Sequence, residues 1–173
     1  MTPPYEPDPL PVAVLAGRER EGRTLCAGLD SVRVVSRRQG VVWTIPRGYV
    51  TDWASVPGLA QVRVQPFGRH AWAAYLHDWL YSVGEPGARA AADAVFLEKL
   101  EEAGVHPLRR SLMFRAVRLG GWGGYGKAAE WWAKAFRDPV TGKLCTPPFP
   151  REAAFAGAEH GPKPWLQPMP VDV

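Results

Sequence analysis

Short apolar stretches with the composition of β-strands occupy the first third of the chain. Residues 12–15 and 31–35 are rich in valine and too short for a helix, so each is expected to form a strand. A turn signal at 39–40 separates the second stretch from residues 41–45, a third strand that Pro46 ends. The segments 31–35 and 41–45 are therefore predicted to pair as a hairpin.

The hydrophobic rhythm changes after Arg69. Large apolar residues now recur every three to four positions, as on the buried face of a helix: Trp72, Tyr75, Leu76, Trp79 and Leu80. This helix is expected to end near Tyr81, because a glycine- and proline-containing turn follows at 84–87. Three further helices are predicted, over about 88–103, from Pro107 up to Gly120, and over about 125–136.

Proline marks both ends of the chain. Of the 18 prolines, five lie in residues 1–11 and eight in residues 138–173. Because proline can neither continue a helix nor sit inside a sheet, both ends are expected to be extended arms. The sequence therefore predicts one α+β domain over 12–137, a small N-terminal β-hairpin region packed on three or four helices, with an arm at 1–11 and another at 138–173.

Composition and charge narrow the functional classes. The 173 residues are 46% hydrophobic and carry a net charge of +4, but the basic residues occur in short, interrupted pairs that do not favour nucleic-acid binding. No apolar run approaches the roughly 20 residues of a membrane helix, and the N-terminus lacks the pattern of a secretory signal. Cys26 and Cys145 do not have metal-knuckle spacing, and whether they pair is open.

Candidate chemistry lies on the first predicted helix. His77, Asp78 and Tyr81 point toward one broad side of this otherwise apolar helix, so they lose solvation and need partners. Asp93, among alanines on the next predicted helix, can hold one nitrogen of His77 and leave the other available as a general base. We take His77, Asp93 and Tyr81 as candidate catalytic residues; the structural alternative is a satisfied buried polar cluster.

A polar loop before this helix adds oxygen atoms. Thr51, Asp52 and Ser55 lie close together after Gly48, and such loops can supply ligands to Ca²⁺. We take Asp78 and Asp52 as candidate metal ligands, with Thr51 and Ser55 as loop support. Asx and Ser/Thr turns use the same residues for purely structural ends.

Four motifs in order resemble a known family. They are the run Gly-Tyr-Val-Thr-Asp-Trp-Ala-Ser-Val-Pro at 48–57, Leu-His-Asp-Trp-Leu-Tyr at 76–81, Ala-Asp-x-x-Phe at 92–96 and Val-Arg-x-x-Gly at 117–121. Together they resemble the phage and prophage family catalogued as domain of unknown function 1353. The resemblance implies an origin in a tailed phage or prophage and a location in the phage particle or host cytoplasm. It supplies no settled activity.

The helix with His-Asp-x-x-Tyr, followed by a carboxylate on the next helix, is also similar to the phospholipase A2 superfamily. By that similarity His77 activates water, Asp78 binds Ca²⁺, and Tyr81 and Asp93 orient His77, with a lipid or cell-envelope substrate. The chain departs from that superfamily because it lacks the disulfide framework and the usual glycine-rich calcium loop. The loop at 51–57 would have to replace the latter.

Two functions follow from these patterns. The first is a virion- or tail-associated phage protein with a calcium-assisted His–Asp hydrolytic site. The second is a non-enzymatic structural or assembly protein whose arms bind neighbouring virion proteins or further copies of this chain. Isolated aromatic residues in the arms and eight tryptophans favour such contacts; the arm aromatics are Tyr5, Phe149, Phe155 and Trp165.

Overall fold

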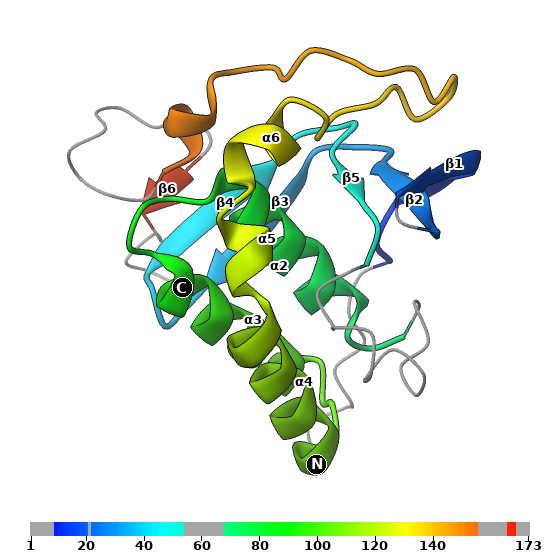
Figure 1. Ribbon diagram of the computed structural model, residues 1–173. Helices are drawn as coiled ribbons and strands as arrows, with labels where there is room; N and C mark the ends of the chain where they lie inside the picture. The colour runs from blue at the N-terminus through cyan, green and yellow to red at the C-terminus, as the bar shows by residue number, and fades with distance from the viewer. Residues whose placement is uncertain (1–8, 21, 54–67, 156–165, 169–173) are drawn as a thin grey trace.

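The computed structural model describes residues 9–20, 22–53, 68–155 and 166–168 (Figure 1). Its class is α+β, as the sequence predicts, with two small antiparallel sheets and a group of helices. The strand order is β1-β2-β5 in one sheet and β3-β4-β6 in the other. The strands are β1 Val12–Arg20, β2 Arg23–Gly28, β3 Val32–Ser36, β4 Val41–Ile45, β5 Val50–Thr51 and β6 Leu166–Pro168.

Strands β3 and β4 form the predicted hairpin. Val32 pairs with Ile45 and Val34 with Trp43. Buried and exposed residues alternate along β3, so its valines at positions 32 and 34 face the core while Arg33 is exposed. The hydrophobic alternation that identifies this hairpin in the sequence is thus the pattern that buries it.

The strand predicted over 12–15 is longer than expected, because β1 continues to Arg20 and pairs with β2. The sequence analysis did not predict β2, whose only large aliphatic residue is Leu25. After Leu15 the pairing register shifts, Gly17 adopts a φ of 71°, and residues 16–19 are exposed. This half of the hairpin therefore carries no hydrophobic pattern that could reveal it.

Three predicted helices are confirmed: α2 Ala71–Val83, α3 Arg89–Glu102 and α4 Pro107–Gly120. Helix α2 ends at Gly84, which has a φ of 53°, a conformation that favours glycine. A Cβ atom at Gly84 would also lie 2.1 Å from the Cβ of Ala128. Glycine here thus both ends α2 and lets the later helices approach it.

The predicted fourth helix over 125–136 is wrong in extent. Two short helices take its place, α5 Trp122–Tyr125 and α6 Ala128–Trp132. Glycine in a helix interior costs about 1 kcal/mol relative to alanine, and Gly126 lies where the helical path is interrupted, between α5 and α6. A Cβ at Gly124 would lie 2.6 Å from the Trp131 ring, so the glycine makes room for that ring.

Aromatic side chains fill the main core around α2. The indole of Trp79 is 1% exposed, and its centroid lies 5.1 Å from the ring of Tyr49 and 5.5 Å from that of Trp132. Such edge-on and tilted contacts give large buried area with favourable ring electrostatics. Because α2 is enclosed by this core on one side and by α3 on the other, its polar side chains must find partners within the protein.

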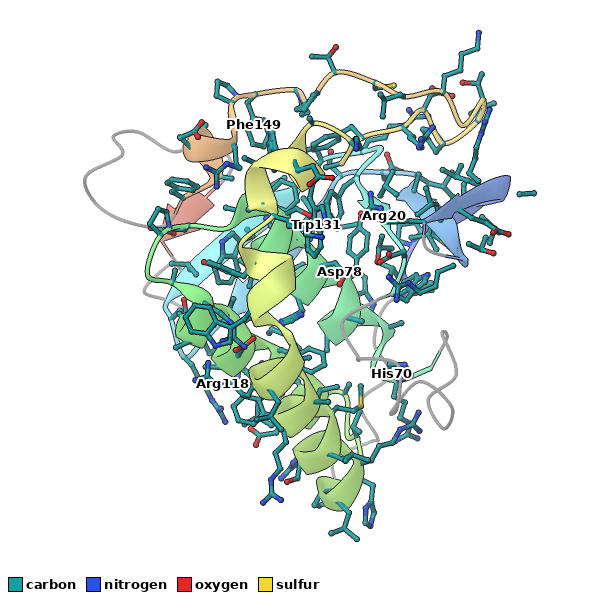
Figure 2. All side chains as sticks on the ribbon, viewed as in Figure 1. Arg20, His70, Asp78, Arg118, Trp131 and Phe149 are labelled. Carbon is teal, nitrogen blue, oxygen red and sulfur yellow. The ribbon has the colours of Figure 1, made fainter. Side chains whose placement is uncertain are left out.

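The described part of the proline-rich C-terminal segment, residues 138–155, runs along the outside of the core (Figures 1 and 2). Phe149 and Phe155 pack against the main hydrophobic cluster. In the short helix η1 (Arg151–Ala154), Arg151 donates a hydrogen bond of 2.8 Å to the carbonyl of Val83 at the end of α2. These two aromatic residues, expected to contact other subunits, therefore contact this chain.

Among the described helices, none is long and apolar enough to cross a membrane. Cys26 is buried, Cys145 is exposed, and both are free thiols. Residues 1–8 of the predicted N-terminal arm, together with Ser55 and Trp165, lie outside the described residues.

Candidate functional site

The structure brings His77 and Asp93 together. His77, on α2, is 2% exposed, and Asp93, on α3, is 0% exposed. The His77 Nε2 and Asp93 Oδ1 atoms are 3.0 Å apart. Asp93 lies among alanines on α3, which packs against α2, and this places its carboxylate within reach of His77. The roles of the two residues stay a prediction, but their proximity is a structural fact.

The Asp93 carboxylate is satisfied on both oxygens. The Tyr81 hydroxyl donates to Oδ1 at 2.8 Å, and the Arg118 guanidinium donates to Oδ2 at 2.9 Å. Arg89 lies 3.8 Å from Oδ2 and also donates to the carbonyls of Val117 and Arg118. Burial by itself raises the pKa of Asp93, but the hydrogen bonds outweigh burial and hold the pKa below its ordinary value. Asp93 is therefore an anion at neutral pH.

The protonation of His77 follows from this partner. Because ionised Asp93 can only accept, His77 donates through Nε2–H and its Nδ1 carries the lone pair. Burial lowers the pKa of His77, against the opposing effect of Asp93, so the imidazole is neutral at pH 7. Within the described part of the protein, Nδ1 has no hydrogen-bond partner. The Tyr81 and Phe96 rings, with centroids 4.1 Å and 4.8 Å away, hold the imidazole in place.

A cavity of about 260 Å³ lies beside His77. It is bordered by α2, by β5, by the ends of β1 and β2, and by the glycine-rich segment that links α4 to α6. Figure 2 shows the labelled Arg20, Asp78 and Trp131 gathered in this region. Asp93 does not line the cavity, whereas His77 does. With Nε2 occupied by Asp93, Nδ1 is the ring nitrogen that is left, buried and without a hydrogen-bond partner among the described residues.

The predicted metal ligands Asp78 and Asp52 line this same cavity. The Thr51 hydroxyl donates to Asp78 Oδ2, and Arg23 donates to Asp52 Oδ2 at 3.2 Å. Calcium needs six to eight oxygen ligands, and within the described residues no group of three His, Cys, Asp or Glu side chains is placed to hold a metal. These side chains do not by themselves form a calcium site, and calcium binding stays a prediction.

Several residues of the site were not identified as functional from the sequence. Arg89 precedes Asp93 by four residues, a helical spacing that could have revealed it. Arg118 and Gly121 belong to the fourth family motif; Arg118 reaches Asp93, and a Cβ at Gly121 would lie 2.2 Å from the Tyr81 hydroxyl. The basic residues that line the cavity carry no local signal, because only the fold brings them together: Arg20, Arg23 and Lys127.

Comparison with known proteins gives one match. A family model described as "Protein of unknown function (DUF1353)" matches residues 29–117, just over half of the chain. The match confirms the resemblance drawn from the four motifs. Neither the curated proteins nor the solved structures contain a match to this chain. The matched span contains His77, Asp78, Tyr81 and Asp93, while Arg20, Arg23, Lys127 and Trp131 lie outside it.

Proposed function

We propose that the cavity beside His77 is the active site of a hydrolase. The chain belongs to the DUF1353 family of proteins of unknown function. One observation carries this proposal. A buried, neutral imidazole lines a cavity and has one nitrogen fixed by a carboxylate, while its other nitrogen is buried and lacks a hydrogen-bond partner within the described residues. Among the described residues, the Tyr75 hydroxyl and Trp79 Nε1 are also buried without a partner, but they do not line the cavity, whereas His77 lines it and its Nδ1 can accept a proton.

The reaction is general-base hydrolysis of an ester. Nδ1 of His77 takes a proton from a water molecule as the water oxygen attacks the carbonyl carbon. Asp93 stabilises the resulting imidazolium through Nε2–H. The C–O bond to the leaving group then breaks, and Nδ1 returns the proton to the departing alkoxide, which leaves a carboxylic acid and an alcohol. Such general-base action contributes roughly 10²–10⁴-fold to a rate.

The cavity wall suggests the class of ester. Arg20 and Lys127 bring positive charge to it, while Val117 and Trp131 supply apolar surface. This combination suits an amphiphilic ester with an anionic group, and phospholipids are the first substrates to test, in line with the similarity to phospholipase A2. If calcium binds, Asp78 is the side chain expected to hold it, and the ion would add positive charge near the carbonyl oxygen.

A non-enzymatic function has its own supporting observation. Arg118 of α4 and Arg89 of α3 connect three helices through Asp93 and the carbonyl of Val117, as expected of a buried polar lock. In that case the protein is a phage structural or assembly component, with other virion proteins as partners. The phage setting and these partners are expectations from the family resemblance.

The test is release of fatty acid from mixed phospholipid vesicles by the full chain, with calcium and with chelator. His77→Gln removes the proposed base, and His106→Gln, at an exposed histidine that precedes α4, is the matched control. We expect release by the unaltered protein and by His106→Gln, and a fall to background in His77→Gln. Equal release by His77→Gln would overturn the proposal, and no release by any protein would favour the structural lock.

The calcium arm separates two versions of the mechanism. If chelator abolishes release and Asp78→Asn reproduces the loss, Asp78 holds the ion. If release persists with chelator, the positive charge at the carbonyl comes from the side chains of the cavity wall, and Lys127→Met is then expected to slow hydrolysis.

A further inference from the structure

Helix α4 presents an apolar stripe to solvent. Its members recur at intervals of four, seven and three residues: Leu108, Leu112, Leu119 and Trp122, exposed by 78%, 57%, 85% and 74%. On a helix of 3.6 residues per turn these positions, together with Arg115, fall on one narrow strip. We call Leu108, Leu112, Arg115, Leu119 and Trp122 the outer face of α4.

The outer face lies opposite the side of α4 that packs on the protein. Met113 and Val117, both buried, point into a hydrophobic cluster with α3. Gly121 continues the helical path with φ −76° and ψ −9°, so Trp122 at the start of α5 extends the stripe. Figure 1 shows α4 extending away from both sheets, with one end beyond the rest of the described fold. Three leucines and a tryptophan this exposed in one line indicate an interaction surface.

The charges around the outer face favour an anionic partner. Residues 107–122 contain four arginines and no acidic residue; Arg109 and Arg115 are exposed, and Arg118 is exposed in part but already pairs with Asp93. Arg115 lies within the stripe itself, so pairing two copies through this face would bring like charges together. An anionic lipid surface instead offers an apolar interior to the leucines and negative headgroups to the arginines. Tryptophan at one end suits the interface between the two.

We infer that the outer face of α4 docks on an anionic lipid surface, with the leucines and Trp122 entering the headgroup region and the arginines contacting phosphate groups. This inference goes beyond the proposed function, because docking requires no hydrolysis. The outer face nonetheless ends near the candidate site, because Gly120 and Gly121, at the end of the stripe, line the cavity beside His77. Docking by this face would bring the cavity close to the lipid.

The experiment is flotation of the full chain with vesicles of phosphatidylcholine alone and of phosphatidylcholine mixed with phosphatidylglycerol. We expect co-flotation with the mixed vesicles, little with phosphatidylcholine alone, and weakening as salt is raised. Fatty acid release is not measured, so the outcome is independent of the hydrolase proposal.

Two variants test the two components of the face. Leu108→Ser combined with Leu119→Ser removes apolar area, and Arg115→Glu reverses one charge. Each is expected to weaken vesicle binding roughly tenfold. Trp122 is left intact because the Arg89 guanidinium lies over its ring at 4.8 Å.

The controls change similarly exposed residues on other surfaces. Val140→Ser combined with Leu144→Ser matches the loss of apolar area, since these side chains are 81% and 54% exposed. Arg37→Glu matches the charge reversal at another exposed arginine. Both controls are expected to bind vesicles as the unaltered protein does.

Three results would overturn the inference. The first is failure of the unaltered protein to float with vesicles that contain phosphatidylglycerol. The second is vesicle binding by the outer-face variants that is as tight as binding by their controls. The third is a concentration-dependent dimer in sedimentation velocity that Leu108→Ser with Leu119→Ser disperses, because it would assign the face to a second copy of the chain.

Discussion

Helix α3 carries two buried carboxylates, Glu98 and Asp93, and their hydrogen-bond networks differ. Glu98, 4% exposed, accepts from the Ser36 hydroxyl at 2.7 Å and from the Arg37 backbone N–H at 2.8 Å. It joins α3 to the hairpin and does not line the cavity beside His77. Asp93 is equally well satisfied, but its partner His77 lines a cavity and has a buried nitrogen without a hydrogen-bond partner among the described residues.

A buried carboxylate alone is therefore no sign of function in this molecule. Both networks neutralise the cost of burying a charge through hydrogen bonds, and both connect elements distant in the sequence. What distinguishes the Asp93 network is the atom that it leaves available. The candidate site is identified by the Nδ1 of His77 rather than by the carboxylate that orients it.

The largest expected effect is from Asp93→Ala, which leaves the Arg89 and Arg118 charges without their shared partner. Removing one member of a buried ion pair costs about 3–5 kcal/mol, and we expect a loss near the lower end because Arg118 is 42% exposed. Urea denaturation followed by circular dichroism measures it. An unfolding free energy within experimental error of the unaltered protein would show that the three helices do not depend on this network.

Glu98→Gln tests the second network, which we expect to affect stability and not hydrolysis. The amide retains one accepting oxygen but places an NH₂ group toward a donor, so the expected loss is about 1–3 kcal/mol. The rate of hydrolysis per folded molecule should not change. A rate loss as large as that of His77→Gln would contradict the assignment of Glu98 to a purely structural network.

A smaller effect is expected in the dependence of stability on pH. The pKa of His77 in the folded protein lies below its ordinary value of 6.5, so between these two values the unfolded chain binds more protons than the folded one. The contribution of the neutral His77 to the free energy of unfolding is therefore complete above about pH 6.5 and is lost as the pH drops through this window. His77→Gln should remove this part of the fall in urea denaturation midpoints. The part due to Asp93, whose folded pKa is also lowered, should remain in more acidic solution.

The smallest expected effect is a change in the titration of one ring. The hydrogen bond and charge of Asp93 raise the pKa of His77 against burial. Asp93→Asn should therefore lower that pKa further, as followed by the imidazole resonances in NMR. An unchanged or raised pKa would separate the two residues electrostatically and contradict the proposed orientation of the base.

The sequence predicts the centre of the site better than its walls. His77, Tyr81 and Asp93 could be found because helical spacing and a run of small residues are local signals. Arg20 and Lys127 are more than 100 positions apart in the sequence and meet only through the fold. Similarly, β2 escaped prediction because its burial comes from pairing with β1 and β5 rather than from its own composition.

The extent of the fourth predicted helix was wrong for a related reason. One helix was predicted over 125–136, but the low helix propensity of Gly126 opposes it, and the helical path is interrupted there between α5 and α6. Gly124 lets the Trp131 ring approach the backbone, and Gly121 does the same for the Tyr81 hydroxyl. A contact of this kind links distant parts of the chain and leaves no periodic trace in the sequence.

The cavity has a consequence for diversification among related chains. Its proposed base and orienting groups lie within the span that matches the family, whereas Arg20, Lys127 and Trp131 come from segments before and after it. A chain can thus exchange this part of the cavity lining without altering the groups around His77. Under the proposed function, related chains could then share a reaction and differ in the molecules that they admit to it.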